Sequence, residues 1–465
     1  MKAFSLLFLA ALTGVAAAQP TAPARPAAPA VPAAPAPAAS PAPAAPAATG
    51  DPSSAAAPSS GPEVLTLERA IEIAMRQQPS LRQSKAQVEA ALGRADLSRV
   101  ARRPTITLDA TAATGSRTQL GNGPDFFSHG ESTGLGAQAS WRIFDFGQTS
   151  ASIRAAELNA DAAAAAVSTT TLDIRTSVET SFLEAVARRR LVQVAETTVK
   201  SEDAHLDQAR RFVAAQAKDP IEVAQAQSRD ANARSALAQA QSNEAISLAN
   251  LRSAIGWVDP SNSPIVPGTW PTPTEADPPG LAALVATARD RRPEIVQLDK
   301  QLAAADASLD AARAERRPVL SASAQTQWSP GTGNWSPEPS WSAGLSLTWS
   351  LFDGGRAAAD TRIAQANLQN AAATRDALLV SLTSQLDSAR SQIVANRANV
   401  QASTQAVSAA RSQLQLAEAR YAQGLGSQIE LADAQTAVTT AEGNLVQAEF
   451  QLSTAWADLH RAIAQ

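Results

Sequence analysis

Three acidic residues are the ones best placed to do chemistry. Glu430 and Asp433 stand three positions apart, so they share one face of a helix. Glu222 stands 208 positions before Glu430, at the matching place in the first half of the chain. Carboxylates can create a negative potential that attracts cations. The simpler interpretation is a helix start, where acidic side chains are favoured by the helix dipole and by exposure.

No other residue pattern points to catalysis or ligand binding. The histidines His129, His205 and His460 are scattered, without the spacing of a metal site. The chain has no Cys, which excludes disulfides, thiolate metal sites and a lipidated N-terminal Cys. It shows no phosphate-binding Gly loop and no nucleophile elbow. We therefore predict that the protein is not an enzyme and uses no cofactor or metal. The net charge of −4 over 465 residues also gives no support to a nucleic-acid partner.

Two long helices are predicted to position the carboxylates. Residues 355–421 can form one helix, which at about 1.5 Å per residue would be on the order of 100 Å long. Apolar residues recur there every seven positions, and the same seam occurs 208 positions earlier. The two rows are Leu379, Leu386, Ile393, Val400, Val407, Leu414 and Tyr421, and Val178, Ala185, Val192, Val199, Leu206 and Val213. A sustained heptad keeps its apolar stripe on a partner only if the helices coil left-handedly around each other. We therefore predict a duplicated unit of long coiled helices.

Four segments between the helices alternate apolar and small polar residues with a period of two. Two of them follow Arg102-Arg103-Pro104, and two follow Arg316-Arg317-Pro318. The apolar positions are Ile106, Leu108, Ala110 and Ala112; Leu135, Ala137, Ala139, Trp141 and Ile143; Leu320, Ala322, Ala324 and Trp328; and Ala343, Leu345, Leu347, Trp349 and Leu351. Each run has roughly the 9–11 residues that a tilted strand needs to cross a bilayer. Its two faces suit a wall between lipid and water, although a soluble half-buried sheet would alternate in the same way.

The tryptophans favour the membrane interpretation. Trp141 and Trp349 lie at matching ends of their strands, whereas Trp328, Trp335 and Trp341 gather near the opposite end. Two such groups are typical of the aromatic girdles at the two interfaces of a bilayer. Four strands cannot close a barrel, and an open sheet edge is not tolerated in hydrocarbon. We therefore predict an oligomer in contact with membrane lipid.

The rest of the chain is divided around this repeat. Residues 1–18 are predicted to be a secretory signal peptide, because a Lys, an apolar stretch and a run of Ala follow one another. Residues 19–62 are rich in Ala and Pro and are predicted to be a disordered linker. We assign residues 63–257 to the first repeat, 258–280 to an irregular segment between the repeats, and 281–465 to the second repeat. The predicted fold class is mainly α with membrane β.

Three motifs, two of them present in both halves, carry a resemblance to a known family. They are the Arg-Arg-Pro turns, Phe352-Asp353-Gly354-Gly355 with its weaker twin Phe144-Asp145-Phe146-Gly147, and, in the second half, Ala419-Arg420-Tyr421-Ala422-Gln423-Gly424-Leu425. From about residue 63 onward the sequence resembles the TolC family of outer-membrane efflux ducts. The resemblance implies a homotrimer in the outer membrane of a Gram-negative bacterium. Four strands per chain would contribute to a 12-stranded β-barrel, followed by a long periplasmic α-barrel of coiled helices.

The resemblance also implies partners and sites. The duct would export small solutes and would dock to a periplasmic adaptor and an inner-membrane pump. The implied docking turn contains Tyr421, Gly424, Leu425 and Ser427. The implied pore constriction is a ring of Glu222, Glu430 and Asp433 from three chains, which would favour cations. The membrane-interface residues would be Trp141, Trp328, Trp341 and Trp349.

Two other functions were compared with this one. A duct for type I protein secretion has the same fold, and the sequence does not separate it from a small-solute duct. A secreted structural coiled-coil protein would explain the helices and the signal peptide, but not the four alternating segments. One departure from the family pattern concerns the first helical turn, residues 215–220, which lacks a Gly where the second turn has Gly424.

Overall fold

The structure is a computed structural model that describes residues 64–117, 128–257, 266–267, 277–330 and 337–464. All described elements belong to one compact unit, residues 61–465. The predicted signal peptide and linker lie outside the described residues, as do Trp335 and most of the irregular segment 258–280.

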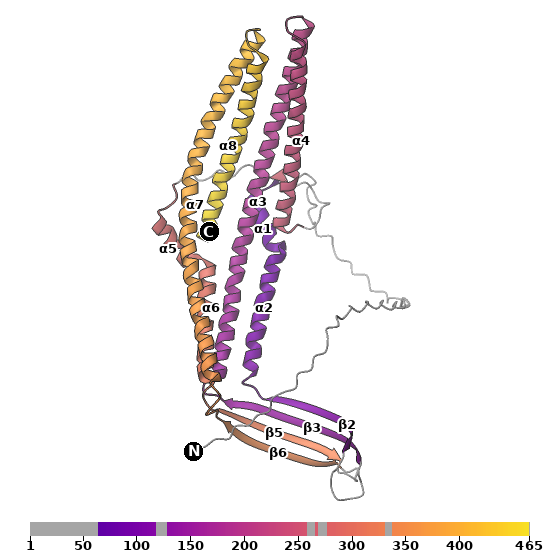
Figure 1. Ribbon diagram of the computed structural model, residues 1–465, viewed down its shortest axis with the longest axis vertical. Helices are drawn as coiled ribbons and strands as arrows, with labels where there is room; N and C mark the ends of the chain where they lie inside the picture. The colour runs from indigo at the N-terminus through magenta and orange to yellow at the C-terminus, as the bar shows by residue number, and fades with distance from the viewer. Residues whose placement is uncertain (1–63, 118–127, 258–265, 268–276, 331–336, 465) are drawn as a thin grey trace, which may run out of the picture. The chain divides into compact units, whose positions relative to one another are not determined.

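The two halves of the chain contain the same helices with the same lengths (Figure 1). In the first half they are α1 (Leu67–Gln77), α2 (Pro79–Val100), α3 (Gln148–Ala214) and α4 (Ile221–Ile255). In the second half they are α5 (Leu281–Arg291), α6 (Pro293–Ala314), α7 (Arg356–Ala422) and α8 (Gln428–Ala462). The long helices α3 and α7 have 67 residues each, and α4 and α8 have 35 each. The predicted duplication is therefore confirmed. Among the described residues, no helix combines the length and the apolar character needed to cross a membrane.

The heptad seams of α3 and α7 are buried as predicted. Val178, Leu386 and Ile393 are completely buried, and they belong to apolar clusters that join each long helix to its neighbours. Each long helix packs along the helix that follows it, α3 along α4 and α7 along α8. Alternating large and small residues allow this close approach, because small positions receive the large side chains of the partner.

In the first half, α2 continues the line of the returning helix α4. Gln78, between α1 and α2, donates its side-chain amide to the carbonyl of Ala254 at 2.8 Å, in the last turn of α4. The end of α4 is thereby held against the start of α2. Both helices pack along α3, so together they accompany it over most of its length (Figure 1).

The strands are β2 (Thr105–Arg117), β3 (Ser128–Phe144), β5 (Val319–Pro330) and β6 (Pro337–Thr348). They form one antiparallel sheet in the order β2-β3-β5-β6. A second, two-stranded sheet pairs β1 (Val64–Leu65) with β4 (Val266–Pro267) in parallel. The last alternating run was predicted to extend to Leu351, but β6 ends at Thr348, because the chain there leaves the sheet for α7.

The register places the predicted apolar positions on one face of the sheet. Ile106 pairs with Ala139, and Leu320 pairs with Leu347. Directly paired residues point to the same face of a sheet, so the four apolar rows form one continuous surface. The opposite face carries the Thr, Ser, Gln and Gly positions. The two faces differ as a wall between lipid and water requires.

Both long helices begin at an aspartate that caps the first turn. Asp145 accepts hydrogen bonds from the backbone N–H of Thr149 at 2.8 Å and of Gly147 at 3.3 Å. In the second half, Asp353 accepts from the N–H groups of Ala357 and Gly355, both at 2.8 Å. The Phe-Asp-x-Gly motifs found in the sequence are therefore helix starts.

Candidate functional site at the helical tip

The tip consists of the two turns that reverse the long helices, residues 215–220 and 423–427. Each turn has one residue in the left-handed conformation, Gln216 with φ 55° and Gly424 with φ 75°. They stand 208 positions apart, so the chain leaves both long helices in the same way although only the second turn has a Gly. The turns differ where the next helix begins, since Pro220 before α4 has a helical backbone and Ser427 before α8 an extended one. A left-handed non-Gly residue costs energy, and the first turn carries this cost at Gln216.

Tyr421 joins the two repeats at the tip. Its side chain is 1% exposed, and its hydroxyl donates to Glu222 Oε2 on α4 at 3.0 Å. Phe212 of α3 packs edge-on against the Tyr421 ring, with centroids 5.7 Å apart. Burial first, and then the Glu222 carboxylate, raise the pKa of Tyr421 to about 12. The hydroxyl therefore remains a hydrogen-bond donor at physiological pH.

Lys218 and Gln428 complete this junction. Lys218 Nζ lies 3.5 Å from Glu222 Oε1 and donates to the carbonyl of Gly426 at 3.5 Å. Gln428, at the start of α8, donates to the backbone carbonyl of Glu222 at 3.0 Å. Glu222 is thus held from three sides by residues of both repeats. No sequence motif marks Lys218, Phe212 or Gln428; the signal that could have indicated them is that Tyr421 is the single Tyr of the chain.

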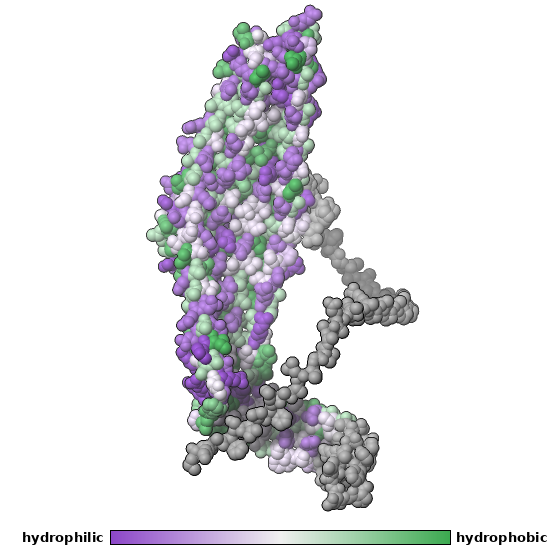
Figure 2. All heavy atoms as spheres, in the orientation of Figure 1, coloured by the Kyte–Doolittle hydropathy of each residue, from purple (hydrophilic) through white to green (hydrophobic). Residues whose placement is uncertain are grey.

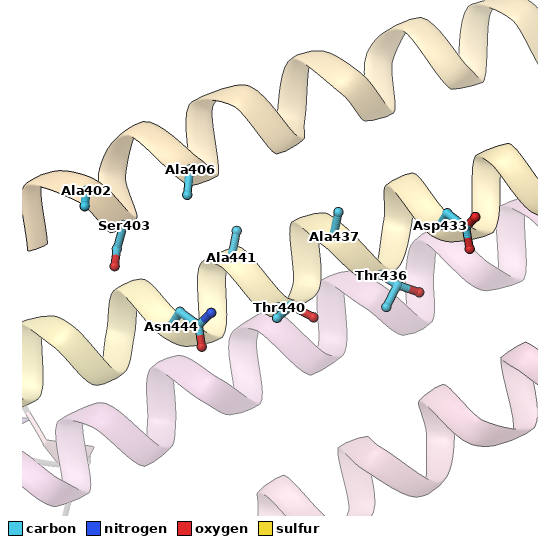
Figure 3. Close-up of a pocket in the computed structure, with 9 residues that line it drawn as sticks. All are labelled: Ala402, Ser403, Ala406, Asp433, Thr436, Ala437, Thr440, Ala441 and Asn444. Atoms are coloured by element: carbon cyan, nitrogen blue, oxygen red, sulfur yellow. The ribbon is translucent and has the colours of Figure 1, made fainter. Parts of the chain in front are cut away.

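Glu430 and Asp433 have different surroundings from Glu222. Ser427 caps α8 by accepting the N–H of Glu430 at 3.1 Å, and the Glu430 carboxylate lies 3.2 Å from Arg420 Nη1. Asp433 is exposed at one end of a shallow groove between α7 and α8 (Figure 3). Small and polar side chains line this groove: Ala402, Ser403 and Ala406 on α7, and Thr436, Ala437, Thr440, Ala441 and Asn444 on α8. Among the described residues of one chain, no three acidic or His side chains gather as a metal site.

The residues of the implied docking turn are partly exposed and partly buried. Leu425 is 72% exposed, and Gly424 and Ser427 shape the turn. Tyr421 lies beneath them and presents no surface. Two further apolar side chains are exposed beside the turns, Ile429 and Ile221.

Below the tip, the two repeats meet along a polar seam between α3 and α8. Ser201 donates to the side-chain carbonyl of Gln435 at 2.9 Å, and its hydroxyl lies 3.2 Å from His205 Nε2. The hydroxyls of Thr198 and Thr439 are 3.0 Å apart. The contacts within each repeat are apolar clusters. At this level hydrogen bonds join the two repeats, whereas each repeat is held together internally by its apolar core.

The four tryptophans of the sheet lie at its two ends, as predicted. Trp141 lies near the end of β3 that leads into α3, and Trp349 directly follows β6. Trp328 and Trp341 lie near the hairpin that joins β5 to β6. All four side chains are exposed. The tryptophans therefore form two groups along the strands. Trp141 and Trp349 lie at the end beside the helices, and Trp328 and Trp341 lie at the end away from them.

Comparison with known proteins identifies the family. The model of the outer membrane efflux protein family matches residues 70–257 and 284–465, which lie in both repeats. The chain belongs to the outer membrane efflux protein family. This confirms the TolC family, to which the sequence motifs pointed. A secreted structural coiled-coil protein is excluded, because the match includes the strand segments as well as the helices.

Relatives with known names cover most of the chain. Protein CyaE of Bordetella pertussis is 31% identical over 399 residues, which are 84% of this chain and 82% of CyaE. Outer membrane protein OprJ of Pseudomonas aeruginosa is 27% identical over 418 residues, which are 85% of this chain and 83% of OprJ. The structure of the outer membrane channel CmeC of Campylobacter jejuni has a TM-score of 0.74 and 16% identity, and the match covers 85% of each chain. This last likeness shows the fold.

The protein is an outer-membrane exit duct of a Gram-negative bacterium with a large periplasmic part. The helices form the periplasmic part, and hydrophilic residues are spread along them on the face shown in Figure 2. Members of the family form homotrimeric channels that work with an adaptor and an inner-membrane pump. The family consists of channel proteins, in agreement with the prediction that the chain is not an enzyme.

Proposed function

We propose that three copies of this chain form a duct for small solutes, which receives its cargo from an inner-membrane pump through a periplasmic adaptor. The observation that carries the proposal is the sheet, whose apolar face is continuous and whose order β2-β3-β5-β6 leaves β2 and β6 as edges. Edges in hydrocarbon require further strands, which the neighbouring copies supply. The efflux family supports small solutes as the cargo.

The proposed adaptor contact is the tip. Leu425, Ile429 and Ile221 are 72%, 65% and 58% exposed, and they lie at the two turns. Apolar side chains exposed in one place are typical of an interaction surface. Tyr421 supports this surface from below, because its ring and hydroxyl fix the end of α7 against α3 and α4.

Deletion of the gene tests the cargo. Sensitivity to small toxic compounds should rise, and proteins secreted into the medium should be unchanged. Loss of one secreted protein without a change in sensitivity would favour the type I secretion duct instead.

Complementation of the deleted strain tests the adaptor contact. The strain should regain resistance with the wild-type gene and with Leu416→Ser, a control at an exposed apolar residue of α7. Leu425→Glu should fail to restore it although the protein reaches the membrane. Full activity of Leu425→Glu would contradict the proposed adaptor contact.

A further inference from the structure

Each strand pair begins at a turn that contains two arginines and accepts a hydrogen bond from a tryptophan. In the first half, the indole N–H of Trp141 donates to the carbonyl of Arg102 at 2.9 Å. In the second half, the indole N–H of Trp349 donates to the carbonyl of Arg316 at 3.1 Å. The contact is therefore duplicated together with the fold. We call each turn with its tryptophan an Arg-Trp corner: Arg102, Arg103 and Trp141, and Arg316, Arg317 and Trp349.

The corners carry positive charge that nearby acids do not neutralise. The four arginines are exposed. Among the described residues, no ion pair joins Arg102, Arg103 or Arg316 to an acid, and Arg317 donates to the carbonyl of Phe146 at 2.7 Å. The adjacent Glu315 lies 3.6 Å from Arg356 instead. Asp353 accepts hydrogen bonds from the first turn of α7, and the charge of Arg316 lowers its pKa only weakly.

Exposed apolar surface begins directly beside these charges. Ile106 and Leu108 follow the first corner on β2 and are 78% and 73% exposed. Leu347, at the end of β6, and the nearby Phe352 are also exposed. Cationic groups thus lie at the border between the apolar face of the sheet and the helices, on the periplasmic side. A ligand that fits both parts has an anionic head and an apolar tail.

We propose that each Arg-Trp corner binds the head group of an anionic phospholipid in the periplasmic leaflet of the outer membrane. The guanidinium groups bind the phosphodiester by charge-assisted hydrogen bonds, and the acyl chains cover the adjacent apolar face. The bond to the arginine carbonyl fixes each indole at the level of the head groups, where tryptophan is favoured. A soluble phosphate would leave the apolar side uncovered, so the ligand is the lipid. The inference rests on the proposed position of Trp141 and Trp349 at the membrane interface.

Lipid binding to the purified full-length protein tests the inference. Delipidated protein in detergent is titrated with phosphatidylglycerol or with zwitterionic phosphatidylcholine, and bound lipid is counted by native mass spectrometry. The wild type should prefer phosphatidylglycerol. In Arg102→Gln with Arg316→Gln the preference should fall about fivefold, since one basic residue near a membrane surface contributes about that factor. Arg289→Gln with Arg291→Gln, two exposed arginines of α5, removes the same charge and should change nothing.

Three results would overturn the inference: equal preference in both double variants, no preference in the wild type, or equal displacement by soluble glycerol phosphate. Mass measurement shows whether the double variant assembles; if it does not, Arg103→Gln alone gives the same comparison. Quenching of tryptophan fluorescence by brominated lipid tests the position of the indoles separately. The quenched signal should fall in Trp141→Phe with Trp349→Phe. Unchanged quenching would contradict the interface position, whereas reduced quenching without lipid preference would contradict only the binding of anionic lipid.

Discussion

At the scale of single residues, Tyr421 is the link between the two repeats at the tip. Its hydroxyl bonds to Glu222, a residue 199 positions away, and its ring lies between Phe212 and Lys218. A hydrogen bond to a charged group contributes about 1.5–3 kcal/mol. The adjoining contact between α3 and α8 is polar at Ser201 and Gln435, so the relative position of the two helical hairpins at the tip depends strongly on this residue.

Tyr421→Phe should loosen the tip without unfolding the helices. The variant keeps the ring and its packing, and it removes only the donor to Glu222. We expect a larger single-channel conductance in planar bilayers, because α4 and α7 can then move apart. Phe212→Leu is a useful comparison, since it changes the packing and keeps the hydrogen bond. Conductance equal to that of the wild type in Tyr421→Phe would show that the bond does not hold the tip.

Neutralising Glu430 and Asp433 should reduce cation selectivity, if the two carboxylates line the passage of an assembled duct. Glu222 is engaged by Tyr421 and Lys218, and Glu430 lies beside Arg420. Within the described part of the chain Asp433 forms no ion pair, and it is exposed, so it should contribute most. In Glu430→Gln with Asp433→Asn, the reversal potential under a salt gradient should move towards zero. Asp306→Asn with Asp310→Asn, on α6, is the matched control. An unchanged reversal potential would leave Glu430 and Asp433 as helix-start residues.

At the scale of elements, the starts of the long helices depend on aspartates. The N–H groups of Ala357 and Gly355 bind Asp353 and lower its pKa. Burial alone would raise the pKa of Asp145, but hydrogen bonds from Thr149 and Gly147, together with Arg142, outweigh it and the pKa is lowered. Both carboxylates are therefore ionised down to a lower pH in the folded protein than in the unfolded chain.

Asp353→Ala should weaken the first turn of α7, because the helix loses its cap. Amide hydrogen exchange in that turn should become about fivefold faster. Because the folded pKa lies below the ordinary value of 3.8, the wild-type cap is complete above that value. It is lost as the pH falls through the folded pKa. Asp376→Ala, at an exposed position within α7, should leave the exchange unchanged. Equal exchange in the two variants would exclude the cap.

The sequence predicted the elements better than it predicted their junctions. The burial of Leu386 and Ile393 follows from a local heptad, and the faces of the strands follow from the alternation of apolar and polar residues. Both could therefore be predicted from the sequence. The bond between Tyr421 and Glu222 joins residues of different repeats, and no local periodicity encodes the position of one repeat against the other. The left-handed Gln216 was also missed, because its neighbours contain none of the usual turn residues at that position. Only comparison with Gly424 in the second repeat could have indicated it.

A lysine on either face of β6 should distinguish the lipid face from the water face. Leu347 pairs with Leu320, and Ser346 pairs with Ser321. Leu347→Lys should reduce the amount of folded protein in the outer membrane, because a Lys at the bilayer midplane costs roughly 2–4 kcal/mol. Ser346→Lys should have a milder effect. Similar yields of the two variants, measured by heat-modifiable mobility on gels, would show that the face assignment is wrong.

At the scale of the whole molecule, the sheet determines the assembly. Within the described residues, β2 pairs only with β3, and β6 only with β5. The outer backbone groups of β2 and β6 need hydrogen-bond partners in a membrane. Pairing β6 of one copy with β2 of the next is a head-to-tail contact, which closes into a ring when the rotation permits. Twelve strands from three copies would form such a ring, as the family indicates.

The assembly can be tested by mass and by cross-linking. Light scattering of the detergent-purified protein should give the mass of three chains. Because the natural chain has no Cys, introduced cysteines report only the chosen contact. Thr107→Cys on β2 is combined in turn with Ser342→Cys, Ser346→Cys or Thr348→Cys on β6, all on the polar face. Oxidation of the best pair should produce a ladder that stops at three chains, since each copy offers one edge to each neighbour. Thr107→Cys alone should give no ladder. A monomer that conducts ions, or a ladder that continues beyond three, would contradict the trimeric ring.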